Sequence, residues 1–192
     1  EAGIGFETRL STFLSQTAPS DKEIAGVCEQ LKKAGTEEDV KQIVSALTKE
    51  DGFTSLKATI ALLETLKGMP DSSHSRSLPR RMQGLKRLLD SENETVAILA
   101  AENLGVWGVP RVNRVLAALV TDGKRQAALR RSAAVALARL AVENDLETLV
   151  NLSKNSDPET RYAALFGLIT VDLDRGIPLA AQLLADDPGE TN

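Results

Sequence analysis

The most constraining feature of this sequence is a pattern that recurs every 30 to 34 residues. Pairs of adjacent alanines occur at residues 100–101, 133–134 and 163–164, at steps of 33 and 30 residues. Gly-Val-Pro occurs at residues 108–110 and the similar Gly-Ile-Pro at 176–178, 68 residues later. Self-similarity near this period is typical of helical-hairpin arrays, in which each repeat buries its apolar face against its neighbours. We therefore expect an all-α fold built from repeated helix pairs.

The composition supports helices packed closely together. Of the 192 residues, 42% are hydrophobic but only 3% are aromatic, and alanine and leucine dominate the apolar set. Strands are enriched in aromatic and β-branched residues, so this composition argues against a β-rich fold. No apolar run reaches the ~18 residues that a membrane span needs, and we expect no membrane insertion.

Capping patterns predict where the helices begin. Ser20 to Glu23 and Ser91 to Glu94 both read as capping boxes, Thr36 as a single cap, and Asp157-Pro158 as a cap followed by a first-turn proline. The periodicity predicts an N-terminal helix at about residues 6–16, followed by five helix pairs. Their helices lie at about 20–33, 36–47, 53–67, 79–89, 91–104, 110–121, 124–141, 144–154, 157–171 and 177–185.

The sequence of the better-defined repeats resembles the HEAT family, and in particular the short HEAT-like repeats also found in phycobilisome lyases. The resemblance is carried by residues 131–140 (RSAAVALARL) and 161–168 (RYAALFGL), and residues 100–105 (AAENLG) fit the same frame. It implies a right-handed α-α superhelix of about five antiparallel helix pairs. There is also a fainter resemblance to HEAT-rich regions of large planctomycete-type multidomain proteins.

The resemblance implies one solenoid domain over residues 1–192. Residues 1–90 fit as degenerate repeats with an inserted polar loop at 68–78, residues 91–187 as clearer repeats, and residues 188–192 as a tail. The sequence begins at Glu1 without methionine or a leader, and we expect it to be part of a larger protein. We expect a soluble monomer; the sequence leaves open whether its compartment is the bacterial cytoplasm or the periplasm.

The residues that catalysis or metal binding would require are scarce. His74 is the only histidine and lies in the polar loop, which excludes a catalytic triad or a multi-histidine metal site within this chain. Cys28, the only cysteine, follows Val27 inside a predicted helix and is interpreted as a small buried apolar residue. Gly3-Ile4-Gly5 lacks the third glycine and the strand of a nucleotide-binding loop. We predict no enzyme activity, no catalytic residues, no metal and no cofactor.

Trp107 lies between two glycines at the junction of a predicted helix pair. It either fills the groove between adjacent repeats or forms an exposed contact, because tryptophan is mostly buried in proteins yet enriched at binding hot spots.

Basic residues gather in the middle of the chain. Residues 76–131 carry eleven basic and five acidic side chains, whereas residues 1–75 and 132–192 have net charges of −4 and −6. The second helix of each HEAT pair usually lines the concave face. The resemblance therefore places a stripe of arginines there, formed by Arg80, Arg81, Arg87, Arg111 and Arg114.

Such a stripe could hold carboxylates or phosphates through bidentate hydrogen bonds. The alternative is that these arginines are solvated or form ion pairs between repeats, each worth ~0–1 kcal/mol. Arg131 and Arg161, at matching repeat positions, suit such pairs best.

Three functions remain open. The first is a non-enzymatic interaction or scaffold module that binds an acidic segment of another protein through the arginines and Trp107. The second is nucleic-acid binding, as in HEAT-like DNA glycosylases, which the isoelectric point near 5.2 disfavours. The third is a tetrapyrrole lyase or chaperone, for which the chain offers few ligand-handling groups, with one cysteine, one histidine and one tyrosine.

Overall fold

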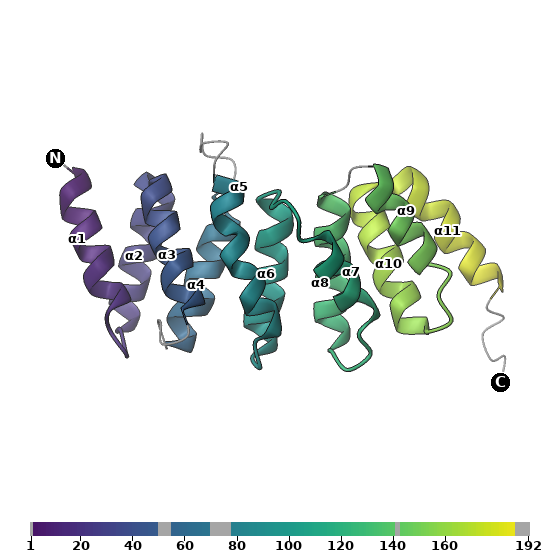
Figure 1. Ribbon diagram of the computed structural model, residues 1–192, viewed down its shortest axis with the longest axis horizontal. Coiled ribbons are helices and arrows are strands. Elements are labelled where there is room, and N and C mark those ends of the chain that lie inside the picture. Colours follow the sequence, from purple (N-terminus) through teal and green to yellow (C-terminus); the bar gives the residue numbers. More distant parts are fainter. Residues whose placement is uncertain (1, 50–54, 70–77, 141–142, 187–192) are drawn as a thin grey trace. The chain divides into compact units, whose positions relative to one another are not determined.

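The computed structural model describes residues 2–49, 55–69, 78–140 and 143–186, and all regular structure in these ranges is helical (Figure 1). The predicted all-α fold is confirmed. Most of the inserted loop with His74, and the tail at 188–192, lie outside the described residues. The helices are α1 (Ala2–Leu14), α2 (Asp21–Ala34), α3 (Glu37–Thr48), α4 (Leu56–Lys67), α5 (Leu78–Arg81), the 3-10 helix η1 (Met82–Asp90), α6 (Glu94–Val106), α7 (Asn113–Thr121), α8 (Ala127–Arg139), α9 (Glu143–Leu152), α10 (Pro158–Val171) and α11 (Leu173–Asp186).

The chain divides into two compact units, Glu1–Pro110 and Arg111–Asn192. In the first unit, α2 packs on α4 and α4 packs on α6, while α1 packs on α3 and α3 packs on η1. Helices two apart in sequence therefore stack on one another in two rows, which is the packing expected of HEAT-type helix pairs. Leucine, valine and alanine side chains fill the space between the rows.

The second unit repeats this arrangement around α10. This helix packs on α8, the corresponding helix of the preceding pair, and also contacts α9 and α11. The alanine pairs that set the sequence period are buried, both at 133–134 in α8 and at 163–164 in α10. At Gly167 of α10 a Cβ atom would lie 2.7 Å from the backbone oxygen of Ala134. Small residues thus allow α8 and α10 to approach each other closely.

Side-chain caps form at three of the four helix starts that the capping patterns predict. Ser20 and Glu23 form the predicted capping box at α2, and Asp157 caps α10 by accepting a hydrogen bond from the backbone N–H of Thr160. Thr36, predicted as a single cap of α3, completes a second capping box with Asp39. These contacts satisfy backbone donors that have no partner inside the helix.

The predicted capping box at Ser91 to Glu94 is wrong. The N-cap of α6 is Asn93, whose side chain accepts a hydrogen bond from the backbone N–H of Val96. The Ser91 hydroxyl accepts instead from the N–H of Asn93, at 3.2 Å. Because Asn93 keeps an extended backbone, with φ −84° and ψ 106°, the helix begins at Glu94 and not at Ser91.

The Gly-Val-Pro and Gly-Ile-Pro triplets, which are similar in sequence, have different structural roles. Gly108 lies in the turn before α7, with a φ of +62° that glycine adopts readily. Gly176 lies inside α11, which begins at Leu173 and not at residue 177 as predicted. A Cβ atom on Gly176 would lie 2.8 Å from the backbone nitrogen of Ile169. The second triplet therefore serves the packing of α11 on α10, with Pro178 within the helix.

Candidate protein-binding surface

The segment that carries the first three predicted arginines is mostly a 3-10 helix. Sequence periodicity predicted one α-helix over residues 79–89, but only Leu78–Arg81 is α-helical and Met82–Asp90 continues as η1. In a 3-10 helix, side chains three residues apart lie one above the other. Arg81, Gly84 and Arg87 therefore form one row along this segment.

This row faces α3. The Nε atom of Arg81 lies 2.8 Å from Oε1 of Glu37, and Nη1 of Arg87 donates to the backbone oxygen of Thr48 at 3.2 Å. Between them, a Cβ atom on Gly84 would lie 3.1 Å from a methyl group of Val44. Arg81 and Arg87 thus bridge the second helices of adjacent repeats. For these two positions, this agrees with arginines that make contacts between repeats and not with a partner.

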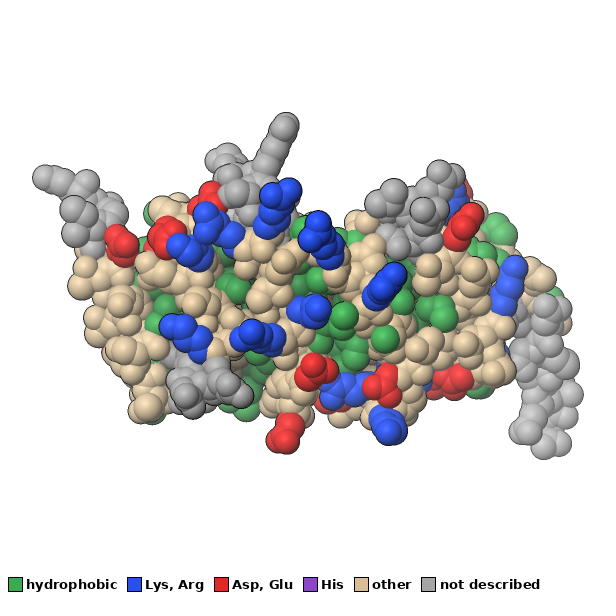
Figure 2. Space-filling view, in the orientation of Figure 1, with side chains coloured by type: hydrophobic (Ala, Val, Ile, Leu, Met, Phe, Trp, Pro, Cys, Tyr) green, Lys and Arg blue, Asp and Glu red, His purple; other side chains and the backbone are tan. Residues whose placement is uncertain are grey.

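Arg80 differs from its neighbours. Its side chain is exposed, and among the described residues it has neither a hydrogen bond nor an ion pair. Lys86, on η1, is exposed and unpaired in the same sense. Figure 2 shows lysine and arginine side chains gathered over α3 and the α5–η1 segment of the first unit. This unit therefore presents cationic groups to solvent beside the two bridging arginines.

Arg111 and Arg114 belong to the second unit and are both exposed. Arg111 has a φ of +62°, a conformation uncommon for residues other than glycine. Arg114 occupies the first turn of α7, where the positive end of the helix dipole disfavours a cation. Neither side chain has a hydrogen bond or ion pair with another described residue. Their cationic groups are thus available to an external anion.

Trp107 lies in the packed interior of the first unit. Only 7% of its surface is exposed, and its Nε1 donates to the backbone oxygen of Leu66 at 3.0 Å. One helical turn earlier, the fully buried Asn103 donates through Nδ2 to the backbone oxygen of Leu63 at 2.9 Å. Both residues thus join α6 to the last turns of α4, as in the groove-filling interpretation.

A buried arginine in the second unit was not singled out by the sequence. Arg130 of α8 donates through Nε to the backbone oxygen of Val120 at 2.9 Å. Its Nη2 donates to Oδ2 of Asp157 and to Oγ1 of Thr160, both at 2.5 Å. It therefore joins the end of α7 to the start of α10.

Neither Arg131 nor Arg161, expected to suit pairs between repeats, forms such an ion pair with another described residue. Arg131 is exposed, and Arg161 donates to the nearby backbone oxygens of Asn155 and Ser156. Arg130 precedes Arg131 in sequence, and its contacts with Asp157 and Thr160 place it on the side of α8 that faces α10.

The hydrogen bonds around Arg130 also lower the pKa of Asp157. The Thr160 hydroxyl and the Arg130 guanidinium both donate to the Asp157 carboxylate and hold the pKa of Asp157 well below its usual range. The carboxylate is therefore ionised across the physiological pH range and pairs with Arg130 throughout it.

Two other classes of site find no support in the described ranges. They contain no cluster of three or more histidine, cysteine, aspartate or glutamate side chains arranged to hold a metal ion. Within the same ranges, every helix is too short or too polar to cross a membrane.

Comparison with known families supports the repeat assignment. Residues 82–169 match the family model described as HEAT repeats. The matched range runs from η1 to α10 and contains the three alanine pairs. No curated protein matches the chain.

Proposed function

We propose that this chain, whose residues 82–169 match the family model of HEAT repeats, binds an acidic segment of another protein through arginines on or directly before the second helices of its repeats and has no enzymatic activity. HEAT repeats generally mediate protein–protein contacts or scaffolding. The proposed contact residues are Arg80 in the first unit, and Arg111 and Arg114 in the second. Within the first unit, Arg81 and Arg87 hold the segment that carries Arg80 against α3, and Trp107 joins α6 to α4 in the interior.

The observation that carries the proposal is the contrast among these arginines. Arg81 and Arg87 have partners on α3, whereas Arg80, Arg111 and Arg114 are exposed and have none among the described residues. An exposed guanidinium keeps five N–H donors in a planar fork that matches a carboxylate. These three residues can therefore bind anions without first breaking a contact with another described residue.

The position of Arg114 adds a second argument. A cation in the first turn of a helix costs about 0.3–1 kcal/mol through the helix dipole. The described structure offers Arg114 no compensating ion pair. An anionic partner at this turn would interact favourably with both the guanidinium and the dipole, so the unfavourable placement in the free chain becomes favourable in the complex.

The test compares the chain with a triple variant, Arg80→Glu, Arg111→Glu and Arg114→Glu. Partners captured from a cell extract are identified by mass spectrometry, and their acidic segments are synthesised as peptides. Affinities are then measured by titration. If the proposal is right, the variant binds such a peptide about tenfold or more weakly, because three attractive charges have become repulsive. Circular dichroism first establishes that the variant keeps its helicity.

A matched control changes three exposed cationic residues outside α3, the α5–η1 segment and α7, through Lys32→Glu, Arg139→Glu and Lys154→Glu. Its net charge equals that of the test variant, so general repulsion affects both alike. Equal weakening by the two variants contradicts a specific arginine surface. Preferential binding of duplex DNA, with affinity falling steeply as salt rises, would instead support the nucleic-acid function.

A further inference from the structure

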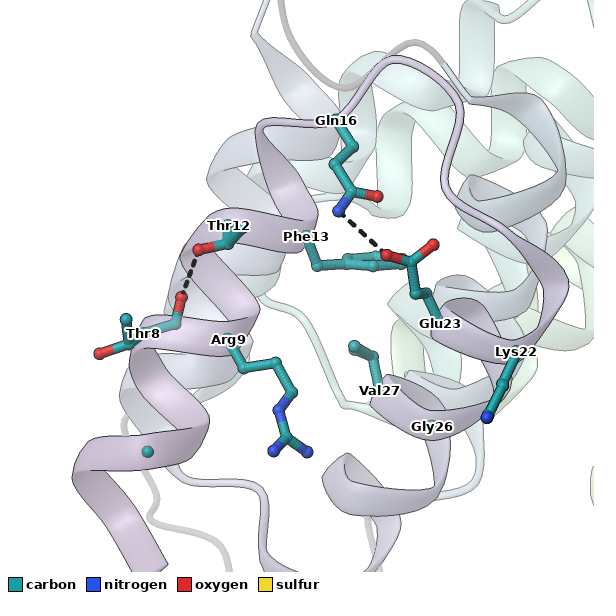
Figure 3. A pocket seen from close by; sticks show the side chains of 10 residues that line it. Thr8, Arg9, Thr12, Phe13, Gln16, Lys22, Glu23, Gly26 and Val27 are labelled. Carbon is teal, nitrogen blue, oxygen red and sulfur yellow. Dashed lines mark hydrogen bonds between the residues drawn. The ribbon is translucent and has the colours of Figure 1, made fainter.

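A cavity of about 500 Å³ lies between α1 and α2, far in sequence from the arginines discussed above. Its floor is apolar and includes Phe13 and Val27, both mostly buried. Figure 3 shows the Phe13 ring and the Val27 side chain between the two helices, with the Arg9 side chain extending from α1 toward α2. Small-molecule sites in proteins are usually apolar clefts of about this size with a few polar groups at the edge.

Two glycines keep the cavity open. Gly5 lies within α1 and Gly26 lies within α2, and both line the space. A Cβ atom at either position would meet no other atom within 4 Å, so neither glycine is needed for close packing. Glycine inside a helix is less stable than alanine. Their presence therefore weakens two helices and, in the free chain, gives no packing advantage in return.

The charges at the cavity edge favour an anion. Arg9 contacts only the neutral amide of Gln30, through a 3.1 Å hydrogen bond from Nη1, and has no carboxylate partner in the described structure. Lys22 is exposed and unpaired within the same residues. Two cations without ion-pair partners thus border an apolar floor.

Glu23, the one acid among the described residues that line the cavity, is already engaged. The hydroxyl and backbone N–H of Ser20 and the side-chain amide of Gln16 all donate to Glu23, and these bonds lower the pKa of its carboxyl. Glu23 therefore stays ionised as part of the α2 capping box. It does not pair with Arg9 or Lys22.

We propose that this cavity binds a small amphipathic carboxylate, whose apolar body lies on Phe13 and Val27 and whose charged end meets Arg9 and Lys22. This site is independent of the proposed arginine surface, because it uses other helices and other residues. Arg9 can keep its bond to Gln30 and still offer its remaining N–H donors to a carboxylate.

Isothermal titration calorimetry with decanoate, using the whole chain, tests the proposal. We expect saturable binding of one decanoate per chain. Gly26→Leu should reduce the affinity at least tenfold, because the new side chain occupies the cavity. Ala25→Leu is the matched control: it adds the same side chain to an exposed neighbouring position that does not line the cavity, and it should bind like the original chain.

The charged end is tested separately with Arg9→Gln combined with Lys22→Gln. This variant should bind decanoate at least tenfold more weakly and leave the affinity for uncharged decanol unchanged. Absence of saturable decanoate binding overturns the proposal, and so does unchanged decanoate affinity in the charge variant. Thermal unfolding of each variant shows that it is folded; if Gly26→Leu is not, the charge variant still decides the outcome.

Discussion

At the scale of single residues, Arg130 is the side chain with the most consequential contacts. It is buried and donates to three groups on two other segments, the Val120 oxygen, Asp157 and Thr160. Replacing it by methionine keeps the apolar stem but leaves these acceptors without their donor. We expect Arg130→Met to lower the free energy of unfolding by about 2–3 kcal/mol, since loss of a buried charged donor costs more than loss of a neutral one.

Chemical denaturation measures this loss, and the neighbouring residue supplies the control. Arg131 is exposed, so Arg131→Met should change stability by less than about 0.5 kcal/mol. Similar effects of the two substitutions would contradict the structural difference between adjacent arginines.

The carboxylate that pairs with Arg130 makes stability depend on pH. Because folding lowers the pKa of Asp157, its contribution is fully present above the unfolded value of about pH 4 and is lost as the pH falls toward the folded value. Asn can still cap a helix but carries no charge. We expect the stability difference between the original chain and Asp157→Asn to be constant from pH 7 to about 5 and to shrink below pH 4. Urea titrations at several pH values measure it, and a difference that stays constant down to pH 2 contradicts the assigned pairing.

Some residue roles follow from sequence alone and others do not. The caps at Ser20 and Asp157 were predictable, because a cap and its partner lie within three residues of each other. Choosing between Arg130 and Arg131 required knowing which side of α8 faces α10, a rotation of about 100° per residue. The partners of Arg81 and Arg87 on α3 are also distant in sequence, 44 and 39 residues away, so local patterns could not reveal them.

At the scale of helices, close approach explains where the sequence prediction failed. The Gly-x-Pro triplet at residues 176–178 predicted a helix start, as glycine and proline often do. In the structure Gly176 instead lets α11 approach Ile169 of α10. The same side-chain types suit both roles, and only the packing of the two helices distinguishes them. The mixed α5–η1 segment escaped prediction for a related reason, since its row of Arg81, Gly84 and Arg87 fits against α3.

Gly176→Ala tests this interpretation. The added methyl group would lie within 3 Å of the Ile169 backbone, which cannot move like the end of a flexible side chain. We expect a loss of about 1–3 kcal/mol from this overpacking, although alanine otherwise favours helices. Gly123→Ala is a control in which nothing lies within 4 Å of the new atom. If Gly176→Ala is as stable as the control by thermal unfolding, α11 does not pack as described.

At the scale of the whole molecule, the alanine period was the most informative feature of the sequence. It predicted the helix pairs because small residues recur where first helices pack closely on a neighbour, and the alanine pairs in α6, α8 and α10 are all buried. The arrangement of the proposed binding arginines was less predictable. Charge counts located a basic middle region, but only the fold separates its bridging arginines from those that remain exposed.

The division into two compact units leads to a prediction for a destabilising substitution at Ala163. Ala163 is buried between helices of the second unit, so Ala163→Glu places an unpaired charge there at a cost of about 3 kcal/mol or more. Hydrogen exchange should show faster amide exchange throughout α8 to α11, with little change from α1 to α4. Ala118→Glu, at an exposed position of α7, should leave exchange in both units unchanged. Uniformly faster exchange along the chain after Ala163→Glu would indicate a single cooperative unit.

The interior position of Trp107 has a spectroscopic consequence. It is the only tryptophan of the chain, and it is buried against α4 in the first unit. Intrinsic fluorescence excited at the red edge of the indole band therefore follows the unfolding of that unit alone. Far-ultraviolet circular dichroism follows the helices of both. Two denaturation curves recorded on one unlabelled sample, one by each method, can thus separate the melting of the first unit from that of the whole molecule.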